Sequence, residues 1–322
     1  MRYLVTGATG FVGQALTQAL ISQGHEVHAL VRNKEADLPI GAIAFEAEFG
    51  KEQAQPRLIN QLSEALQEVE VVIHTAARVH VMDETTADPL SEFRAINRDA
   101  TLLLAELAAQ TGVKRFVFLS SIKVNGEKTE KDKPFTAEDT PHPTDPYGVS
   151  KLEAEQGLLE LSRKTQMDVV IIRPPLVYGP GVKANFAVMM KWVKRGIPLP
   201  FACVDNRRSL VALDNLIDFI ELCASPSRAP NAANEVFLVA DTTPVSTREL
   251  LQSIAAAYGQ KARLWPLPVR LMTMGATLLG KKALSERLFG NLEVDTRKNK
   301  NVLSWQAKTS LTQQLKKMIE TT

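Results

Sequence analysis

Hydrophobic and polar positions follow two different patterns along the first half of the chain. The runs Tyr3–Thr6, Val27–Val31 and Asp168–Arg173 are almost continuously apolar, which is typical of strands buried on both faces of a parallel sheet. Between the first two, apolar residues recur at helical spacing over 11–23, and Gly24 ends the helix. The same patterns predict strands at Val69–His74 and Arg115–Ser120, and helices at Ala100–Gln110 and from about Ser150. We therefore expect an α/β fold, a doubly wound parallel sheet with helices on both faces.

The pattern changes after residue 178. Prolines and loops become frequent, and helices are separated by short extended pieces such as Glu235–Val239. We expect residues 1–178 to form the sheet-containing domain, a later strand within 205–240 to return to it, and residues 179–322 to form a smaller C-terminal lobe. The apolar stretch Leu264–Leu279 is interrupted by prolines and is shorter than the roughly 20 residues of a membrane span. It predicts a buried or lid-forming helix.

Composition narrows the class of protein. The 322 residues carry a net charge of only +2 and no run of like charges, which argues against nucleic-acid or membrane partners. Cys203 and Cys223 lie outside any CxxC motif, which favours a reduced, cytoplasmic protein. The first predicted strand begins beside the N-terminus and leaves no room for a signal peptide. The five histidines lack the spacing of a metal site, so we expect no metal.

A glycine-rich turn connects the first predicted strand with the first helix. Gly7, Gly10 and Gly13 have the spacing GxxGxxG. The first glycine permits a tight turn, the second lets a pyrophosphate approach the backbone, and the third allows close packing of helix on strand. Free N–H groups at the helix N-terminus attract the anion. This context predicts a Rossmann domain that binds NAD or NADP within residues 1–178, and it leaves residues 179–322 mainly for the substrate.

The end of the second strand bears on the choice of cofactor. An acidic residue there would bind the ribose 2′-hydroxyl of NAD. The sequence has no carboxylate over Leu30–Asn33, and Arg32 can pair with the 2′-phosphate of NADP. We favour NADP over NAD, with a solvated surface arginine as the alternative.

Tyr147 and Lys151 are the most informative pair of polar residues. Four positions apart on a helix, they share one face. A free phenol titrates near pH ~10, too high for a base at neutral pH, and a nearby ammonium favours the phenolate and lowers that pKa. The pair follows a strand that ends in Leu119-Ser120-Ser121. We therefore expect proton transfer at a carbon that bears a hydroxyl or keto oxygen, with a hydride moving to or from the cofactor.

These motifs resemble those of the extended short-chain dehydrogenases/reductases, the NAD-dependent epimerase/dehydratase family. The resemblance covers nearly the whole chain. Beyond the glycine turn and the Tyr–Lys pair, the matching segments are His74–Ala77, Ser120–Ser121, Arg173–Pro180, Asn185–Phe186, Arg208–Asp214 and Asp295–Trp305. Within the family, Ala77–Met82, Ser121–Gly126 and Val182–Phe186 are most similar to proteins described as UDP-glucose 4-epimerase-like or as UDP-N-acetylquinovosamine dehydrogenases, which are 4-ketoreductases.

The resemblance implies a role for each matching residue. Ser121 would polarise the reacting oxygen, Tyr147 would donate or accept the proton, and Lys151 would hold the nicotinamide ribose. Asn97 would brace the site. The implied cofactor-binding residues are Gly7, Thr9, Gly10, Phe11, Val12, Gly13, Arg32, Ala76, Ala77, Lys151 and Pro174. The implied substrate-binding residues are Asn185, Arg208 and Lys123. Arg208 would pair with the nucleotide diphosphate of a UDP-sugar, although Arg207 stands beside it and an ion pair with Asp214 is the structural alternative.

Departures from the family pattern separate the reaction classes. Nucleotide-sugar dehydratases carry Asp-Glu after the catalytic Ser or Thr, whereas this chain has Ile122-Lys123, so dehydration is disfavoured. Arg32 fits a reductase that exchanges NADPH better than an epimerase that retains NAD. We expect chemistry at C4 of a UDP-sugar, as 4-ketoreductase or 4-epimerase, in surface polysaccharide precursor synthesis.

Other readings of the sequence remain open. UDP-glucose 4-epimerase activity proper, a reductase of a non-nucleotide ketone or alcohol, and a non-catalytic NADP sensor are the alternatives. The family usually forms homodimers through two helices, which lie at about Ser91–Gln110 and Ser150–Thr165 in this chain. We expect the same here.

Overall fold

The computed structural model describes residues 1–50, 55–79, 88–278 and 288–321. Its centre is a seven-stranded, entirely parallel sheet with the strand order β3-β2-β1-β4-β5-β6-β9. The strands are β1 (Arg2–Thr6), β2 (Glu26–Val31), β3 (Ala42–Glu46), β4 (Val71–His74), β5 (Arg115–Leu119), β6 (Asp168–Arg173) and β9 (Glu235–Leu238). The expected α/β, doubly wound fold is confirmed.

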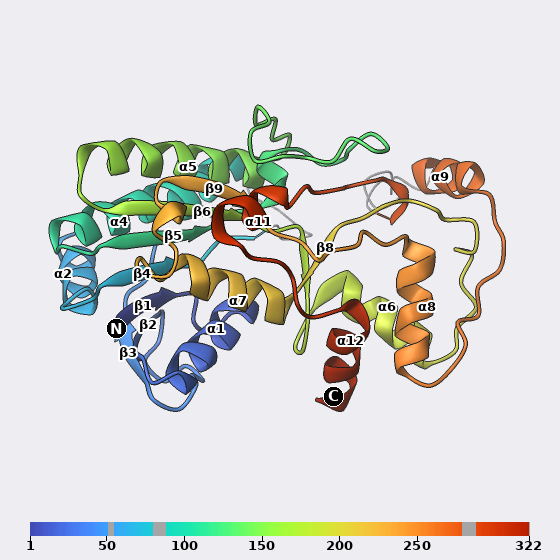
Figure 1. Cartoon of the computed structure of the whole chain (residues 1–322), viewed down its shortest axis with the longest axis horizontal. Helices are drawn as coiled ribbons and strands as arrows, with labels where there is room; N and C mark the ends of the chain where they lie inside the picture. The colour runs from blue at the N-terminus through green and yellow to red at the C-terminus, as the bar shows by residue number, and fades with distance from the viewer. Residues whose placement is uncertain (51–54, 80–87, 279–287, 322) are drawn as a thin grey trace.

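Helices cover both faces of this sheet (Figure 1). On one face lie α1 (Phe11–Ser22) and α7 (Leu213–Cys223), and on the other lie α2 (Pro56–Ala65), α4 (Ala100–Gln110) and α5 (Pro146–Lys164). Strand β1 shows why its apolar run is continuous. Tyr3 and Val5 belong to the first core, and Leu4 belongs to the second, because successive side chains of a strand point to opposite faces. A strand covered on both sides has no polar face to display.

The predicted elements recur with small shifts, and one strand was missed. Helix α5 begins at Pro146 instead of about Ser150, because the Asp145 side chain accepts a hydrogen bond from Gly148 N and caps the helix. Strand β3 was not predicted. It is the edge strand beside β2, and none of its residues is fully buried. Its sequence, AIAFE, is nevertheless a short and largely apolar run, so the sequence did carry a signal for this strand.

The C-terminal part forms a second body around a two-stranded parallel sheet. Strands β7 (Leu176–Tyr178) and β8 (Leu210–Ala212) pair there, flanked by α6 (Ala184–Lys194), α8 (Thr247–Ala257) and α12 (Leu311–Glu320). The rings of Tyr178 and Phe186 stack in its core, 5.4 Å apart. Helix α11 (Arg297–Leu303) and α7 lead back to the main sheet, where β9 lies beside β6.

The expectation of a buried helix in this lobe is wrong, whereas that of a lid-forming helix stays a prediction. Within the stretch 264–278, only α9 (Val269–Leu278) is helical, and it has no buried residue. Leu271, Met274 and Leu278 are all exposed. An apolar sequence alone does not show whether a partner surface exists to cover it. Among the described helices, none is both long enough and apolar enough to cross a bilayer.

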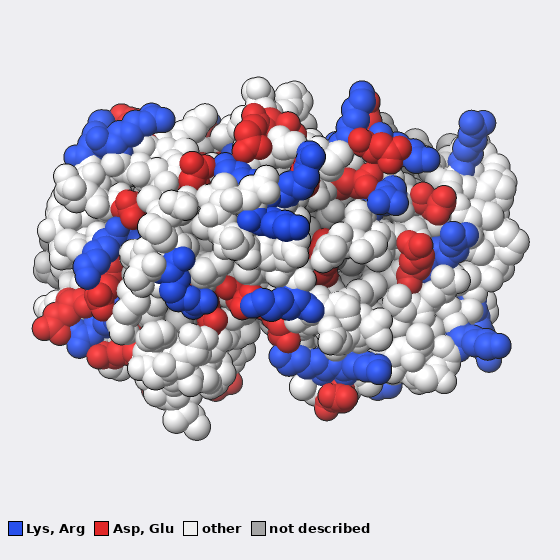
Figure 2. Space-filling model, in the orientation of Figure 1, with Lys and Arg blue, Asp and Glu red and all other residues white. Residues whose placement is uncertain are grey.

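Backbone hydrogen bonds join the two bodies on the side opposite α1. Thr129 N donates to Asn291 O over 3.0 Å, and Phe135 N donates to Glu293 O over 2.8 Å. On the other side, a cleft of about 1000 Å³ separates α1 and α7 from α12, and it is lined by Thr9 through Phe11 together with Lys183. Figure 2 shows this side as a notch at the lower edge, with cationic and anionic side chains interspersed over both bodies.

Candidate active site

The glycine turn has the geometry of a phosphate-binding loop. Gly7 adopts φ +69°, and Gly10 N donates to Gly7 O over 2.8 Å. A Cβ on Gly13 would lie 2.1 Å from Gly7 O, so only glycine allows α1 to approach the strand this closely. Thr9 and Gly10 are exposed. Because α1 has neither a side-chain cap nor an acidic residue in its first turn, its N–H groups face the cleft and fit a pyrophosphate.

The carboxyl ends of β1 and β4 are held together by a buried histidine. His74 Nδ1 is 2.8 Å from the Thr6 hydroxyl, and His74 Nε2 is 2.9 Å from the Thr101 hydroxyl. Burial lowers the pKa of His74 to about 3, so the ring stays neutral at physiological pH. Ala76 N donates to Thr6 Oγ1 over 3.2 Å, which fixes the half-buried Ala76–Ala77 segment beside the glycine turn. The histidine is thus a structural link and not an acid or base.

Arg32 lies where the adenosine ribose of a Rossmann cofactor would be expected. It is exposed at the end of β2 and lines a cavity of about 510 Å³. Arg57 from the first turn of α2 lines the same cavity, and so do Glu46 and Glu48. The cavity therefore offers two guanidinium groups as well as two carboxylates.

The three expected catalytic residues come together at the carboxyl edge of the sheet. Ser121 lies two residues after the end of β5 and caps the one-turn helix η2 (Ile122–Val124). Tyr147 is the second residue of α5, and the Ser121 side chain is near enough to lower the pKa of its phenol. Lys151 follows one helical turn later and is 1% exposed. Its Nζ donates to Leu119 O over 2.8 Å and lies 4.1 Å from the Phe118 ring centroid.

The electrostatics of the pair differ from the sequence expectation. The pKa of Tyr147 is raised to about 12, first by burial and then by the charge of Asp145, against the lowering effect of Ser121. Burial also lowers the pKa of Lys151 to about 7, against the opposing effect of Glu155. The expected lowering of the tyrosine pKa by the lysine is therefore absent here. Desolvation dominates both groups, and the ammonium is bound to Leu119 O.

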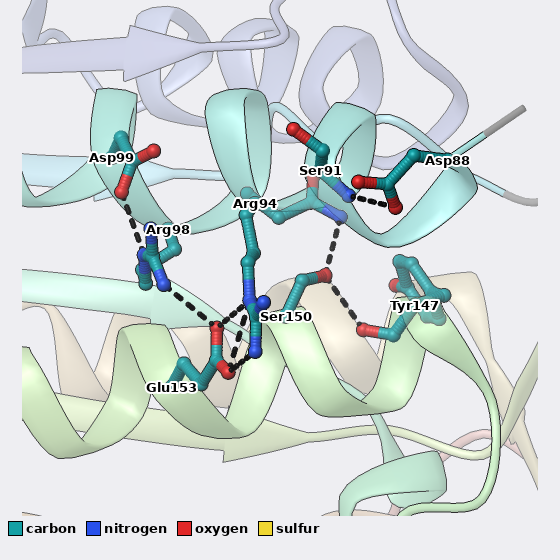
Figure 3. A network of polar contacts seen from close by, with 9 residues as sticks. Asp88, Ser91, Arg94, Arg98, Asp99, Tyr147, Ser150 and Glu153 are labelled. Carbon is teal, nitrogen blue, oxygen red and sulfur yellow. Dashed lines mark hydrogen bonds and ion pairs between the residues drawn. The ribbon is translucent and has the colours of Figure 1, made fainter.

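The backbone of α5 is braced by the helical segments that precede α4, which include α3 (Pro89–Arg94). Asn97 lies in a π-helical turn, Ala95–Asp99, and its Nδ2 donates to Ser150 Oγ over 3.0 Å. Ser150 Oγ in turn donates to Tyr147 O over 2.8 Å. Figure 3 shows this link beside the ion pairs that Arg94 and Arg98 make with Glu153 on the same helix. Two neighbouring helices thus fix the position of Tyr147.

A buried ion pair behind the site was not predicted. Glu155 and Arg173 are 2% and 4% exposed, and Arg173 Nε donates to Glu155 Oε1 over 3.0 Å. The Ser120 hydroxyl also donates to Glu155. Arg173 directly precedes the buried Pro174. The available signals were a charged residue inside an apolar strand pattern and a glutamate four residues after Lys151, but spacing alone does not show that the two meet.

The predicted substrate residues lie on several elements. Asn185 is exposed in the first turn of α6. Arg208 donates to Gly290 O over 3.1 Å, and the neighbouring Arg207 pairs with Glu293 at 2.7 Å. The alternative of an Arg208–Asp214 pair is not seen, since Asp214 pairs with Lys317. Lys123 forms ion pairs with Asp145 and Glu127. The resembling segment Ala77–Met82 lies partly outside the described residues.

Known proteins match both the sequence and this arrangement. The model of the NAD dependent epimerase/dehydratase family matches residues 3–239. The chain belongs to this family. A UDP-glucose 4-epimerase of Vibrio cholerae is 43% identical over 309 residues, which cover 94% of this chain and 89% of the relative. A 2-alkyl-3-oxoalkanoate reductase of Stenotrophomonas maltophilia is 26% identical, covering 80% and 76%.

Solved structures agree with the fold. MoeE5 in complex with UDP-glucuronic acid and NAD aligns with a TM-score of 0.76 at 26% identity, covering 99% of this chain and 98% of that one. UDP-glucose 4-epimerase of Thermotoga maritima, with UDP-glucose, aligns with a TM-score of 0.77 at 23% identity over 100% and 98%. The expectation of an NAD-dependent enzyme of the epimerase/dehydratase family is confirmed.

Proposed function

We propose that the protein moves a hydride between NAD(P) and C4 of a UDP-sugar, as a 4-ketoreductase or a 4-epimerase. The observation that carries the proposal is the convergence of Ser121, Tyr147 and Lys151 at the carboxyl edge of the sheet, beside an open phosphate-binding turn. The 43% identity to a UDP-glucose 4-epimerase supports a UDP-sugar as substrate.

The residues of the site divide the chemistry among them. A nicotinamide bound at the glycine turn would supply or accept the hydride. Tyr147 donates its proton to the C4 oxygen in the reductive direction and takes it back in the oxidative direction. Ser121 donates a hydrogen bond to the same oxygen and polarises it. Lys151, once released from Leu119 O, holds the ribose and stabilises the phenolate by its charge.

The residues after Ser121 support the exclusion of a dehydratase. Ile122 is buried against Leu238 and Leu292, and the next side chain is a lysine that is held by two carboxylates. Neither position offers the acid or base that elimination of water requires.

Reductase and epimerase differ in their use of cofactor. Arg32 and Arg57 line the adenosine-side cavity and support NADP, and hence a reductase that exchanges its cofactor. The Vibrio cholerae relative supports the epimerase. We place either activity in surface polysaccharide precursor synthesis. The free Cys203 and Cys223 are consistent with a cytoplasmic location.

Product analysis separates the two reactions. The protein is incubated with UDP-N-acetylglucosamine, UDP-glucose and a UDP-4-keto-6-deoxy sugar, each with and without NADPH. Net oxidation of NADPH with loss of the keto group identifies a reductase, and interconversion of C4 epimers without net oxidation identifies an epimerase. No reaction with any UDP-sugar would contradict the proposal.

A non-nucleotide ketone is the second candidate substrate, because a 2-alkyl-3-oxoalkanoate reductase is among the relatives. Thermal unfolding with added UDP distinguishes the two. A ligand that binds the native state raises its melting temperature. UDP should stabilise the protein in addition to NADPH if the substrate is a UDP-sugar. Stabilisation by NADPH alone favours the second candidate.

The cofactor preference has its own test. Replacing Arg32 with Gln removes a guanidinium that can pair with a 2′-phosphate, so we expect at least about a tenfold weaker affinity for NADPH and little change for NADH. Dissociation constants from nucleotide fluorescence measure both. Arg2→Gln is the control, since Arg2 is an arginine that does not line the Arg32 cavity. Tighter binding of NADH than of NADPH by the unaltered protein would contradict the NADP assignment.

A further inference from the structure

Lys123 connects the two segments that carry the reacting hydroxyls. It lies in η2, two residues after Ser121, and its ammonium forms an ion pair with Asp145, two residues before Tyr147. Glu127 Oε1 lies 3.1 Å from the same ammonium. The side chains of Lys123 and Asp145 are each 22% exposed, so the pair is largely shielded from water. An ion pair in this setting is stronger than one on the open surface.

Asp145 has a second partner on the catalytic helix. Its Oδ1 accepts a hydrogen bond from Gly148 N over 2.6 Å, which caps α5. A negative charge at a helix N-terminus is favourable for the helix. The same charge is unfavourable for ionisation of Tyr147, because a nearby carboxylate raises the pKa of a phenol. A cation that neutralises Asp145 without breaking its hydrogen bond to Gly148 N would therefore favour ionisation of Tyr147 and keep the helix cap.

The backbones of the two segments are also in close contact. A Cβ on Gly148 would lie 3.0 Å from Lys123 O, so the first turn of α5 sits directly against η2. Lys123 N donates to Ser121 Oγ over 3.3 Å. The turn that orients the serine and the turn that carries the tyrosine are thus joined by Lys123 through both its backbone and its side chain.

We propose that Lys123 is a positioning residue, whose ammonium fixes Asp145 at the start of α5 and shields Tyr147 from that carboxylate. Lys123 acts here through Asp145 and not on a substrate phosphate. The inference rests on the proposed function only in taking Ser121 and Tyr147 as the reacting pair.

Other charges around Tyr147 do not replace this one. Lys151, on the same helix, is bound to Leu119 O. Across the Phe93 ring, which is 6.1 Å from the Tyr147 ring, Arg78 and Glu92 are 4.0 Å apart and together carry no net charge.

The positive charge of Lys123 is itself compensated by carboxylates. Its ammonium faces two carboxylates, those of Asp145 and Glu127. Removal of Lys123 takes one cation away from Asp145, whose charge raises the pKa of Tyr147.

The test is a double-mutant cycle read by pH dependence. In the pH profile of kcat/KM, the limb that reports the ionisation of Tyr147 should move to higher pH in Lys123→Met, by on the order of one unit. Asp145→Asn keeps a good helix cap and should shift the limb to lower pH. The double variant should match Asp145→Asn alone. Lys123→Arg keeps the charge and should stay near the unaltered protein. Lys133→Met, an exposed lysine paired with Glu130, is the matched control and should change nothing.

Two results would overturn the proposal. In the first, Lys123→Met raises KM for the UDP-sugar, leaves the pH limb in place and is not rescued by Asp145→Asn, which would assign Lys123 to the substrate phosphate. The second needs no substrate. The tyrosinate absorbance of Tyr147, taken as the difference from a Tyr147→Phe protein, should appear at higher pH in Lys123→Met and at lower pH in Asp145→Asn. An unchanged titration refutes the shielding even if no UDP-sugar turns over.

Discussion

At the scale of single residues, burial favours the uncharged forms of both Tyr147 and Lys151. Tyr147 holds its proton more tightly than a free phenol, and Lys151 holds its proton less tightly than a free amine. A phenol with a high pKa suits proton donation to a keto oxygen. A phenolate base requires that the site change when cofactor and substrate bind, with Lys151 leaving Leu119 O.

Substitution of Tyr147 by Phe tests its role directly. The change removes only the hydroxyl, so turnover should fall by at least about a hundredfold because proton transfer is lost. Affinity for NADPH should remain, since the glycine turn is untouched. Steady-state kinetics and nucleotide fluorescence measure the two effects. Turnover that survives the substitution would refute the mechanism, and loss of both activity and cofactor binding would point to a folding defect.

The pH dependence of stability follows from Lys151. Its pKa in the folded protein is about 7, against about 10.5 unfolded, so the unfolded state binds more protons between these values. Stability contributed at this position therefore rises as pH increases from 7 towards 10, by at most about 1.4 kcal/mol per unit. Urea unfolding of the unaltered protein and of Lys151→Met across this range measures the difference. A constant difference between the two proteins would contradict the shift.

At the scale of elements, α5 gathers most of the site through its spacing. Tyr147, Lys151 and Glu155 are four residues apart, so they lie along one side of the helix. That side faces the ends of β5 and β6, where Ser120 and Arg173 meet Glu155. The amphipathic pattern of the helix hides this arrangement, because the glutamate and the arginine replace apolar residues in the core.

Glu155 should matter more for stability than its distance from the reacting atoms suggests. Glu155→Ala leaves the Arg173 guanidinium buried without its carboxylate, and we expect a loss of about 3–5 kcal/mol. Glu160→Ala, on the same helix, breaks an exposed pair with Lys164 and should cost less than about 1 kcal/mol. Urea unfolding compares them. Equal losses would show that the buried pair contributes no more than the exposed one.

Sequence patterns predicted the buried strands and the helices between them. Burial of a strand on both faces gives a continuous apolar run, and burial of a helix along one side gives apolar residues at helical spacing. They did not predict β3, whose edge position leaves its residues partly exposed, or the exposure of α9. Within the site, the glycine turn and the Tyr–Lys pair follow from local spacing. The Glu155–Arg173 pair and the capture of Lys123 by Asp145 depend on contacts between distant segments, which no local spacing reveals.

At the scale of the whole molecule, association remains a prediction. The two helical regions where a dimer is expected, at about Ser91–Gln110 and Ser150–Thr165, carry the ion pairs of Arg94 and Arg98 with Glu153 (Figure 3). None of the described large apolar side chains that are exposed lies on either helix. An interface there would have to use polar and half-buried groups.

Sedimentation velocity decides whether the dimer forms. We expect a species of twice the chain mass of 35.4 kDa at micromolar concentration. Charge reversal by Glu153→Arg should dissociate it, whereas Glu130→Arg, on the distant loop before Phe135, should not. A single species of chain mass at every concentration would exclude the predicted homodimer.

The burial of Ile122 bears on how this enzyme can evolve. Its side chain packs with Leu238, from the sheet edge, and with Leu292, from the C-terminal part. Ile122, which follows Ser121, therefore contacts both bodies. A mutation to Asp, the first step towards a dehydratase, would bury an unpaired charge in that contact. The intermediate would lose stability before it gained a new reaction. A loss of stability therefore opposes this substitution unless several packing residues change together.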